Sequence, residues 1–340
     1  MRVGLAGTGR IGAFHGATLA SHGAVDELLV ADVDAERAAA VAGRLREHGT
    51  AGLVESRPVE DLLDAGLDAL VIAAATDAHA DLIVAAVERG VPTLCEKPVS
   101  LDLGRTLEVV KVVESADVPV QIGFQRRFDA GYRAAREAVA GGGLGFVHTV
   151  VAQTLDNAPP PADYVARSGG IFRDCLVHDF DVIRFVTGRE VSSVFATGSN
   201  RGAAYFRELG DVDTATAVLV LDDGTNVLVA GTRYNAAGHD VRLEVLGSEG
   251  GLAVGLDDRM PLRSAQPGVT FPAGRPYRDF LDRFADAYRA ELAGFLALVG
   301  GAGENACTVT DGLQALRIAE ACDLSRLKGR SVDLEEVPTS

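Results

Sequence analysis

The sequence contains no tryptophan and only four cysteines, Cys95, Cys175, Cys307 and Cys322. No two of these form a Cys-x-x-Cys pair, and all lie far apart or within apolar patterns. A disulfide framework is therefore not indicated, because small disulfide-stabilised proteins carry closely spaced cysteines. We expect four buried, reduced thiols, as in a protein of the cytoplasm.

Long apolar runs and an excess of positive charge are also missing. No apolar run approaches the roughly 20 residues that a membrane span requires. The first residues, MRVGLAGTGRIG, lack the successive basic, apolar and cleavage regions of a signal peptide. Lys and Arg number 32 against 48 Asp and Glu, so the formal net charge is −16. Because this charge repels nucleic-acid phosphates and anionic lipids, we expect a cytoplasmic protein that binds neither nucleic acid nor membrane.

Internal repeats and the common hydrolase motifs are absent as well. We find no repeat with a period of a few tens of residues, which excludes solenoid and propeller folds. There is no Gly-x-Ser-x-Gly elbow, Walker lysine loop or His-Glu-x-x-His motif. What is present is a chain of 340 residues, 47% of them hydrophobic, which is long enough for two domains with separate cores.

The first 124 residues alternate short apolar runs with amphipathic stretches. The apolar runs are RVGLAG, LLVADV, DALVIAAA, VPTLC and VPVQIGF. The stretches with helical periodicity are Ile11–Ser21, Ala35–Arg46, Ala78–Glu88 and Leu103–Ser115. This alternation predicts an α/β domain over residues 1–124, with a Rossmann-type doubly wound parallel sheet.

Residues 125–340 have a different pattern. Strands of alternating polarity and a hairpin, TATAVLVL, DDGT and NVLVAGTRY, predict a large, mainly antiparallel sheet. Helical stretches at about Asp174–Thr187, Phe280–Val299 and Asp311–Leu327 make this an α+β domain. We assign it to substrate binding and oligomerisation, with a C-terminal helix that can pack back on the first domain.

A glycine motif opens the first predicted helix. Gly7, Gly9 and Gly12 form G-T-G-R-I-G directly after the first strand. The first glycine permits a tight turn, the second lets the backbone approach a pyrophosphate, and the third lets the helix pack on the strand. The backbone at Arg10 and Ile11 then directs helix N–H groups at the phosphates.

An acidic residue follows at the distance that a dinucleotide site requires. Asp32 ends the second strand, 20 positions after Gly12, where a carboxylate accepts hydrogen bonds from the adenosine ribose hydroxyls. The same carboxylate repels the 2′-phosphate of NADP, and no arginine follows it immediately, since Arg37 lies five positions on. The pattern predicts NAD as the cofactor. A doubly wound domain for another nucleotide, or for none, is the alternative.

Polar residues follow two further strands of the predicted sheet. Glu96, Lys97 and Pro98 come just past VPTLC, at the edge where ligands of open α/β sheets bind. Pro98 restricts Lys97 to extended dihedrals, and the bond between them can be cis. A surface lysine before a turn proline, or a polar residue at a helix start, is common without a function. We nevertheless count four residues after these strands with the cofactor site: Thr76, His79, Glu96 and Lys97.

An acid and a histidine share one predicted helix. Asp174 and His178, in GGIFRDCLVHDFDVIRFVTG, are four residues apart, so on an α-helix they lie one turn apart on the same face. A carboxylate in that position orients an imidazole and tunes its basicity. By itself, such a pair is more often a surface interaction than a catalytic pair.

Together, the glycine motif, DAHADLI, CEKPVS and the D-x-x-x-H helix resemble the glucose–fructose oxidoreductase and inositol dehydrogenase family, known as Gfo/Idh/MocA. The resemblance covers essentially the whole chain, and SGGIFRD, HDFD and QIGFQRRFD are similar to the inositol dehydrogenase branch. It implies an NAD-dependent dehydrogenase that oxidises a secondary hydroxyl of an inositol-like cyclitol, or of a sugar, to a ketone. It also implies a catalytic triad of Lys97, Asp174 and His178. Hydroxyl-binding residues implied in the same way are Arg127, Asp156 and Asn157.

One residue departs from the family pattern. Where similar enzymes carry an aromatic hydroxyl, this chain has His239, with Tyr234 nearby in a strand. His239 is a candidate substrate contact, but a solvated loop histidine beside Asp240 is the more ordinary interpretation. Asp174 and His178 have no third ligand at a suggestive spacing, so no metal is expected.

Two other functions stay open at this point. Relatives with this fold include NAD-dependent glycosidases, and a regulatory protein can bind a dinucleotide and a protein partner without turnover. The presence of Lys97, Asp174 and His178 together argues against a regulator. The long strands of the second domain also need a cover on their outer face, which predicts a homo-oligomer, either a dimer or a tetramer.

Overall fold

In a computed structural model, which describes residues 1–338, the chain divides into two units. The first unit comprises Met1–Gln125 together with Asp286–Leu313. The second comprises Arg126–Ala285 and the chain from Gln314 onward. The late segment of the first unit, Asp286–Leu313, thus holds the larger, C-terminal part of helix α10 (Phe280–Val299). It includes only the beginning of the last helix, α11 (Val309–Lys328).

The first unit is built on a six-stranded parallel sheet in the order β3-β2-β1-β4-β5-β6. Its strands are β1 (Arg2–Ala6), β2 (Glu27–Ala31), β3 (Leu53–Ser56), β4 (Ala69–Ile72), β5 (Thr93–Glu96) and β6 (Val120–Gly123). This order reverses between β1 and β4, which is where open α/β sheets form a ligand crevice at the carboxyl ends of the strands. The predicted doubly wound sheet is therefore confirmed.

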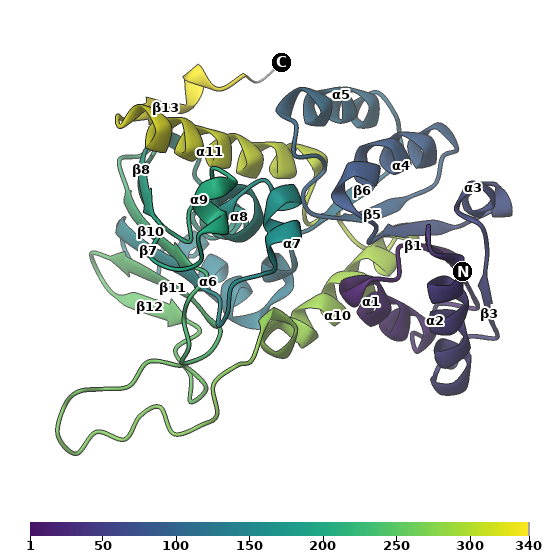
Figure 1. The fold of residues 1–340 in the computed structure, drawn as a ribbon, viewed down its shortest axis with the longest axis horizontal. Coiled ribbons are helices and arrows are strands. Elements are labelled where there is room, and N and C mark those ends of the chain that lie inside the picture. The colour runs from purple at the N-terminus through teal and green to yellow at the C-terminus, as the bar shows by residue number, and fades with distance from the viewer. Residues whose placement is uncertain (339–340) are drawn as a thin grey trace. The chain divides into compact units, whose positions relative to one another are not determined.

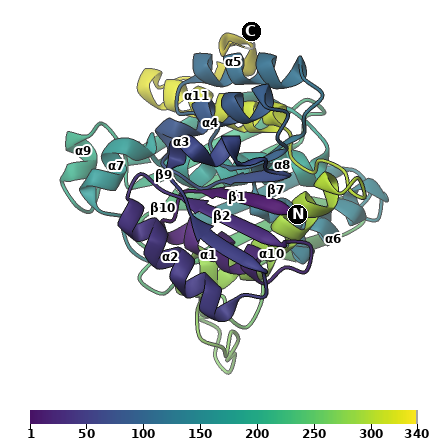
Figure 2. The same ribbon diagram turned by 90° about the vertical axis from the view of Figure 1, so that its right-hand side faces the viewer.

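Strand β3 was not among the predicted strands. It is an edge strand in which Val54 is the one fully buried residue, so its sequence, LVES, carries no long apolar run. The helices of this unit cover both faces of the sheet, as Figures 1 and 2 show. Helices α1 and α2 lie on one face, and α4 and α5 on the other. The helices are α1 (Arg10–Ala20), α2 (Ala35–His48), α3 (Val59–Leu62), η1 (Leu63–Ala65), α4 (Thr76–Glu88) and α5 (Leu103–Glu114).

The central core of the first unit joins the sheet to α10. Buried apolar side chains of β1, β2 and β4 pack with Leu292, Phe295 and Leu296 of that helix. Because these three side chains are almost fully buried, each contributes about 1.5–3 kcal/mol of burial free energy. The segment Asp286–Leu313 is thus an integral part of the Rossmann-type unit.

The second unit contains a seven-stranded sheet in the order β12-β11-β7-β10-β9-β8-β13, in which only the β7–β10 pair is parallel. The predicted hairpin is formed by β9 and β10 around a turn at Gly224, whose φ of 87° favours glycine. The strands are β7 (Val147–Leu155), β8 (Val191–Ser199), β9 (Thr214–Leu221), β10 (Asn226–Thr232), β11 (Asp240–Gly247), β12 (Gly251–Val254) and β13 (Val332–Asp333). A large, mainly antiparallel sheet is confirmed.

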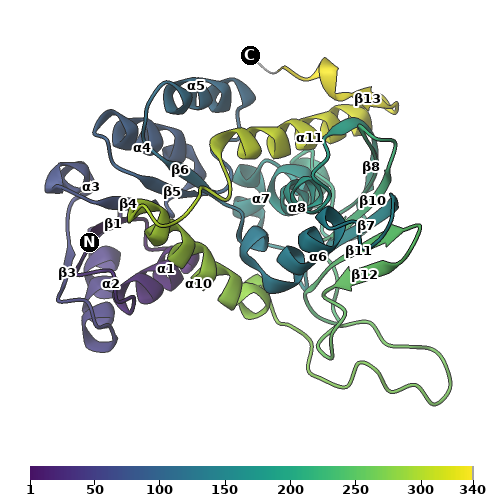
Figure 3. The same ribbon diagram turned by 180° about the vertical axis from the view of Figure 1, so that it is seen from behind.

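Helices cover one face of this second sheet. Figures 1 and 3 show α6 and α8 on that face, and among residues 1–338 no helix lies on the other face. A long segment without helix or strand, residues 255–279, extends away from the sheet between β12 and α10 (Figure 3). The helices of this unit are α6 (Ala130–Ala140), α7 (Ala162–Ser168), the π-helix η3 (Phe172–Leu176), α8 (Val177–Thr187), α9 (Tyr205–Glu208) and η4 (Leu334–Glu336), with η2 (Gln125–Phe128) at the junction.

Candidate functional site

The glycine motif forms the turn from β1 into α1. Gly7 has a φ of 100°, and a Cβ there would lie 2.4 Å from the carbonyl oxygen of Ala73. A Cβ on Gly12 would lie 2.1 Å from the carbonyl oxygen of Gly7. At Gly9, by contrast, no atom lies within 4 Å of such a Cβ, and α1 begins directly afterwards without a side-chain cap. The turn therefore packs closely on two sides and leaves its middle glycine open, which fits a pyrophosphate approaching the helix N-terminus.

The helix start itself is exposed. The side chain of Arg10 is exposed and that of Ile11 is half-buried, so both stand at the open end of the helix. The predicted role of Arg10 and Ile11 is to donate backbone N–H groups to the phosphates. Both residues lie in the first turn of α1, where the backbone N–H groups have no partner within the helix.

The carboxylate of Asp32 lies beside the glycine turn. It accepts hydrogen bonds from the backbone N and the Oγ1 of Thr8, both at 2.7 Å, and from the backbone N of Asp34 at 3.0 Å. Arg37 donates to the same carboxylate through Nη2 at 2.5 Å. Burial alone would raise the pKa of Asp32, but the bonds from Arg37, Asp34 and Thr8 hold it well below its ordinary value. Asp32 is thus a fixed anion at the end of β2.

The pairing with Arg37 was not predicted. The sequence showed this arginine five positions after Asp32 and gave it no partner. The signal is the helix between them: Arg37 is the third residue of α2, so its side chain starts one turn from the end of β2.

Lys97 follows β5 and is half-buried. The Lys97–Pro98 peptide bond is cis, as the sequence allows. His79, on the first turn of α4, is buried and places Nδ1 2.8 Å from the carbonyl oxygen of Pro98 and Nε2 3.1 Å from that of Ala74. Carbonyl oxygens only accept hydrogen bonds, so a ring N–H of His79 that is donated to the Pro98 oxygen braces the turn that carries Lys97. Thr76, the first residue of α4, is half-buried.

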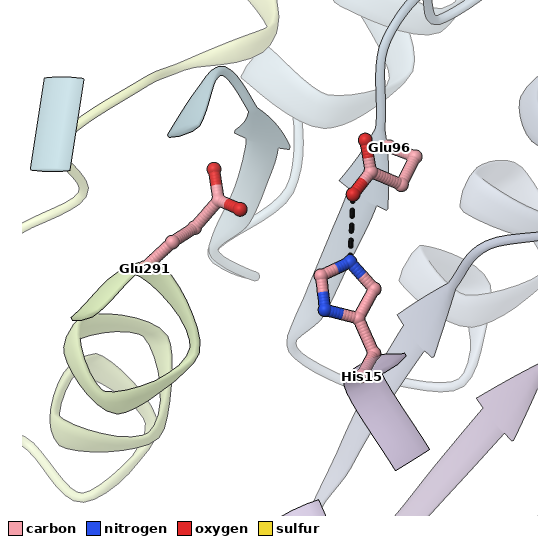
Figure 4. Close-up of side chains that lie close together, drawn as sticks. All are labelled: His15, Glu96 and Glu291. Carbon is pink, nitrogen blue, oxygen red and sulfur yellow. Dashed lines mark hydrogen bonds and ion pairs between the residues drawn. The ribbon is translucent and has the colours of Figure 1, made fainter. Parts of the chain in front are cut away.

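Glu96 belongs to a buried cluster that the sequence did not reveal. Its Oε1 lies 2.6 Å from Nε2 of His15 on α1, and Glu291 of α10 completes the group, as Figure 4 shows. All three side chains are buried. The carboxylate of Glu96 is therefore held in the interior of the first unit. The missed signal is His15, three residues after Gly12 on the same helix.

In the second unit, the acid and the histidine do not share one regular α-helix. Asp174 lies in the π-helix η3 and His178 is the second residue of α8. The predicted helical stretch at about Asp174–Thr187 is present, but its first part is π-helical, and a π-helical turn is wider and does not stack residues four apart as an α-helix does. Both side chains are half-buried.

Asp174 is bonded to residues distant in sequence. Its Oδ2 accepts a hydrogen bond from Nη2 of Arg233 at 2.7 Å, and its Oδ1 accepts one from the hydroxyl of Tyr164 at 2.8 Å. Burial, and then the neighbouring Asp174 charge, raise the pKa of Tyr164, so this hydroxyl stays protonated. The carboxylate is thus oriented by two donors.

Arg233 links Asp174 to a second carboxylate. It follows β10, is only 4% exposed, and donates through Nη1 to Oδ2 of Asp156 at 2.8 Å. Burial alone would raise the pKa of Asp156, but the contacts with His239 and Arg233 lower it. The second unit therefore holds two oriented anions joined by one buried guanidinium, and neither Arg233 nor Tyr164 was predicted. Asn157, beside Asp156, is exposed.

His239 is not a solvated loop residue. It is 4% exposed, its Nδ1 lies 3.4 Å from Oδ1 of Asp156, and its backbone pairs with Tyr277. The ordinary interpretation given above is wrong, because the long segment before α10 returns to cover this histidine. Its role as a substrate contact stays a prediction.

Arg127 has a structural partner. Its Nε and Nη2 donate to both carboxylate oxygens of Asp181 at 2.7–3.1 Å, and its guanidinium lies over the ring of Phe185. Asp181 is fully buried on α8. These contacts indicate that Arg127 anchors α8, and they do not support the hydroxyl-binding role that the family resemblance implied.

Two composition-based expectations can be compared with the described residues. All four cysteines are buried, as predicted, and none of them forms a disulfide within residues 1–338. No helix within residues 1–338 is long and apolar enough to cross a membrane. In that range the sole group of three residues with metal-ligand atoms close together is His15, Glu96 and Glu291.

Known proteins match this chain over both units. A model of the oxidoreductase family with an NAD-binding Rossmann fold matches residues 1–124, and one of the GFO/IDH/MocA C-terminal domain matches residues 132–253. Myo-inositol dehydrogenase Hyg17 of Streptomyces leeuwenhoekii is 39% identical over 331 residues, which cover 97% of this chain and 98% of that protein. These matches confirm the resemblance drawn from the sequence and NAD as the cofactor.

Solved structures of inositol dehydrogenases are also similar to this chain over nearly its whole length. A myo-inositol dehydrogenase from Corynebacterium glutamicum has a TM-score of 0.88 and 36% identity, with 100% of this chain and 99% of that chain covered. A scyllo-inositol dehydrogenase from Lactobacillus casei, solved with bound NAD(H) and scyllo-inositol, has a TM-score of 0.85 and 26% identity over 98% of both chains.

Proposed function

Since the chain belongs to the Gfo/Idh/MocA family of oxidoreductases with an NAD-binding Rossmann fold, we propose that it oxidises a secondary hydroxyl of a cyclitol to a ketone. Inositol or a closely related cyclitol is the first-choice substrate, and a pyranose sugar the second. The observation that carries this proposal is the pair of oriented carboxylates, Asp156 and Asp174, held by Arg233. Carboxylates fixed in this way are suited to accept hydrogen bonds from neighbouring hydroxyls of a polyol.

The residues proposed to hold the cofactor are those of the first unit. The turn at Gly7, Gly9 and Gly12 takes the pyrophosphate, and Asp32 takes the adenosine ribose. When NAD is bound, its nicotinamide ring supplies the acceptor for the hydride. Further proposed contacts come from residues after β4 and β5, namely Thr76 and Lys97.

The proposed chemistry assigns one role to each member of a triad. His178 takes the hydroxyl proton as general base, and Asp174 orients the imidazole of His178. Lys97 donates a hydrogen bond to the same oxygen and stabilises the negative charge that develops as the hydride leaves the carbon. Arg233 and Tyr164 hold Asp174 in its orientation. Support for joining the three residues in one reaction comes from the family resemblance.

A panel of inositol stereoisomers and simple sugars, assayed with NAD by NADH absorbance, tests the proposal. We expect NADH to form with at least one cyclitol and more slowly with sugars. An NAD-dependent glycosidase would instead cleave a nitrophenyl glycoside without net NADH formation, and a regulatory protein would bind NAD and turn over nothing. Either result would replace the proposal. From the net negative charge and reduced cysteines we also infer a cytoplasmic location.

A further inference from the structure

Glu96, the residue before Lys97 in the chain, belongs to the buried cluster of His15, Glu96 and Glu291 (Figure 4). We propose that His15 is a positioning residue of the dehydrogenase reaction: through Glu96 it fixes the chain from which the Lys97 amine extends. This inference rests on the proposed function, in which Lys97 acts on the reacting oxygen. His15 itself is assigned no contact with substrate or cofactor.

The distance within the cluster favours a hydrogen bond over ligation of a metal ion. Two ligands bound to one Zn²⁺ at about 2.0–2.2 Å in tetrahedral geometry lie roughly 3.3 Å apart. Nε2 of His15 and Oε1 of Glu96 are only 2.6 Å apart, which is a short hydrogen-bond distance. In this structure the pair is therefore hydrogen-bonded. Because charge-assisted hydrogen bonds of this kind are strong in a buried site, the bond holds Glu96 in one orientation.

The covalent chain transmits this orientation to Lys97. Glu96 is the last residue of β5 and Lys97 is the next. Successive side chains of an extended chain point to opposite sides, so a Glu96 side chain fixed inward sets the side from which Lys97 leaves. Pro98 restricts the backbone of Lys97, and His79 contacts the Pro98 carbonyl oxygen at 2.8 Å. The lysine thus stands between two histidine-held neighbours.

Helix α1 extends the effect of the His15–Glu96 hydrogen bond beyond the end of β5. Its N-terminus follows the glycine turn, and His15 lies on its second turn. The rings of Phe14 and His15 both contact Tyr288 of α10 edge to face, with centroids 5.9 and 5.8 Å away. Glu291 lies one turn further along α10. The same helix that is proposed to receive the pyrophosphate is therefore tied to the end of β5.

The neighbouring strand leaves room for Glu96 in this position. Gly123 of β6 pairs with Glu96 in the sheet, and a Cβ on it would lie 3.2 Å from both the Cα and the Oε2 of Glu96. An alanine there presses on the carboxylate while leaving His15 intact. Gly123→Ala is therefore an independent way to disturb the orientation of Glu96.

The test uses the scarcity of lysine in this chain. Lys97, Lys111 and Lys328 are its three lysines, so protein labelled with ¹³C-lysine gives three Cε signals, which Lys111→Arg and Lys328→Arg assign. His15→Phe keeps a ring but removes the hydrogen bond, and His15→Gln keeps a donor. His48→Phe, at an exposed histidine of α2, is the matched control.

We expect His15→Phe to shift or broaden the Lys97 signal alone and to lower kcat about 10- to 100-fold, because small displacements of a reacting group carry losses of that size. Its KM for NAD should stay within a few-fold. His15→Gln should recover most of the loss, Gly123→Ala should move the same signal, and His48→Phe should match the wild type.

A Lys97 signal and a kcat unchanged in His15→Phe would overturn the proposal. So would a loss of kcat that only follows the unfolded fraction, or one stoichiometric metal ion that Glu291→Gln loses. If the wild-type protein oxidises no cyclitol, the proposed function fails, yet the Lys97 signal still decides whether His15 sets the position of the lysine. Should His15→Phe fail to fold, Gly123→Ala carries the same comparison.

Discussion

Arg233 follows strand β10 and Asp174 lies in the π-helix η3, and Nη2 of the arginine donates to Oδ2 of the aspartate at 2.7 Å. The same guanidinium also donates a hydrogen bond to Asp156. One arginine side chain, 5% exposed, thus forms ion pairs with two carboxylates. Such a pairing is geometrically specific, because the planar guanidinium presents its donors in a fixed fork.

Arg233→Lys should therefore lower activity more than it lowers stability. A lysine keeps the charge but cannot hold both carboxylates in the fork geometry, so we expect kcat to fall by about 10- to 100-fold. Arg242→Lys, at an arginine whose hydrogen bonds go to Asp240, is the control and should retain activity. Steady-state kinetics and thermal melts of both variants make the comparison. Equal kcat in the two variants would show that the bridge has no part in the reaction.

The cofactor preference should depend on Asp32 and Arg37 together. Asp32→Ser removes the carboxylate that repels a 2′-phosphate and releases Arg37, which then has a phosphate to bind. We expect the ratio of kcat/KM for NAD to that for NADP to fall by at least about tenfold, or roughly 1.4 kcal/mol. Arg37→Ala in addition should cancel the gain. Comparable wild-type efficiency with both cofactors would refute the role of Asp32.

Acid should remove the stability that Asp156 contributes. Its pKa is lowered in the folded chain, so its stabilisation is fully present above the unfolded pKa of about 4 and is lost as the pH falls through the folded value. Asp156→Asn should cost about 1–3 kcal/mol of unfolding free energy at pH 7. Urea melts between pH 7 and pH 3 should show the two proteins converging below about pH 4. A difference that stays constant or grows in acid would contradict this assignment.

The uncovered face of the second sheet should bind another copy of the chain. Phe195, Val218 and Leu228 lie side by side on neighbouring strands and are 46%, 41% and 47% exposed. Apolar side chains in such a row favour association, so the wild type should be a dimer or tetramer and Val218→Glu should weaken it. Leu327→Glu, at an exposed leucine of α11, is the control. Light scattering that reports a wild-type monomer at micromolar concentration would count against the oligomer.

The sequence revealed the parts of the fold that local patterns encode. The glycine turn and Asp32 depend on a strand, a turn and a helix in succession, and each has a compositional signal. Strand β3 escaped because an edge strand buries little, and the π-helix η3 escaped because its residues follow a helical pattern without showing the wider turn. The boundaries of the six other predicted helices differ from the observed ones by at most two residues, whereas α6, α7 and α9 were not predicted.

The contacts between distant segments could not be predicted in the same way. Arg233 meets Asp156 because β10 pairs in parallel with β7, so the ends of both strands reach the same edge. No local sequence pattern predicts the register between β7 and β10. His239 is buried by the return of the chain at Tyr277, and the pairing of His15 with Glu96 joins positions 81 residues apart. These are properties of tertiary packing.

The triad is tested most directly by the turnover of Lys97→Ala on the best cyclitol. If the amine stabilises the developing alkoxide, kcat should fall by about two to four orders of magnitude while the Kd for NAD stays within a few-fold. His178→Ala should fall similarly and recover in part at high pH, where hydroxide replaces the missing base. Asp174→Asn should lie between them, and thermal melts must show each variant folded. Well-folded Lys97→Ala and His178→Ala proteins with near wild-type kcat would contradict the proposed mechanism.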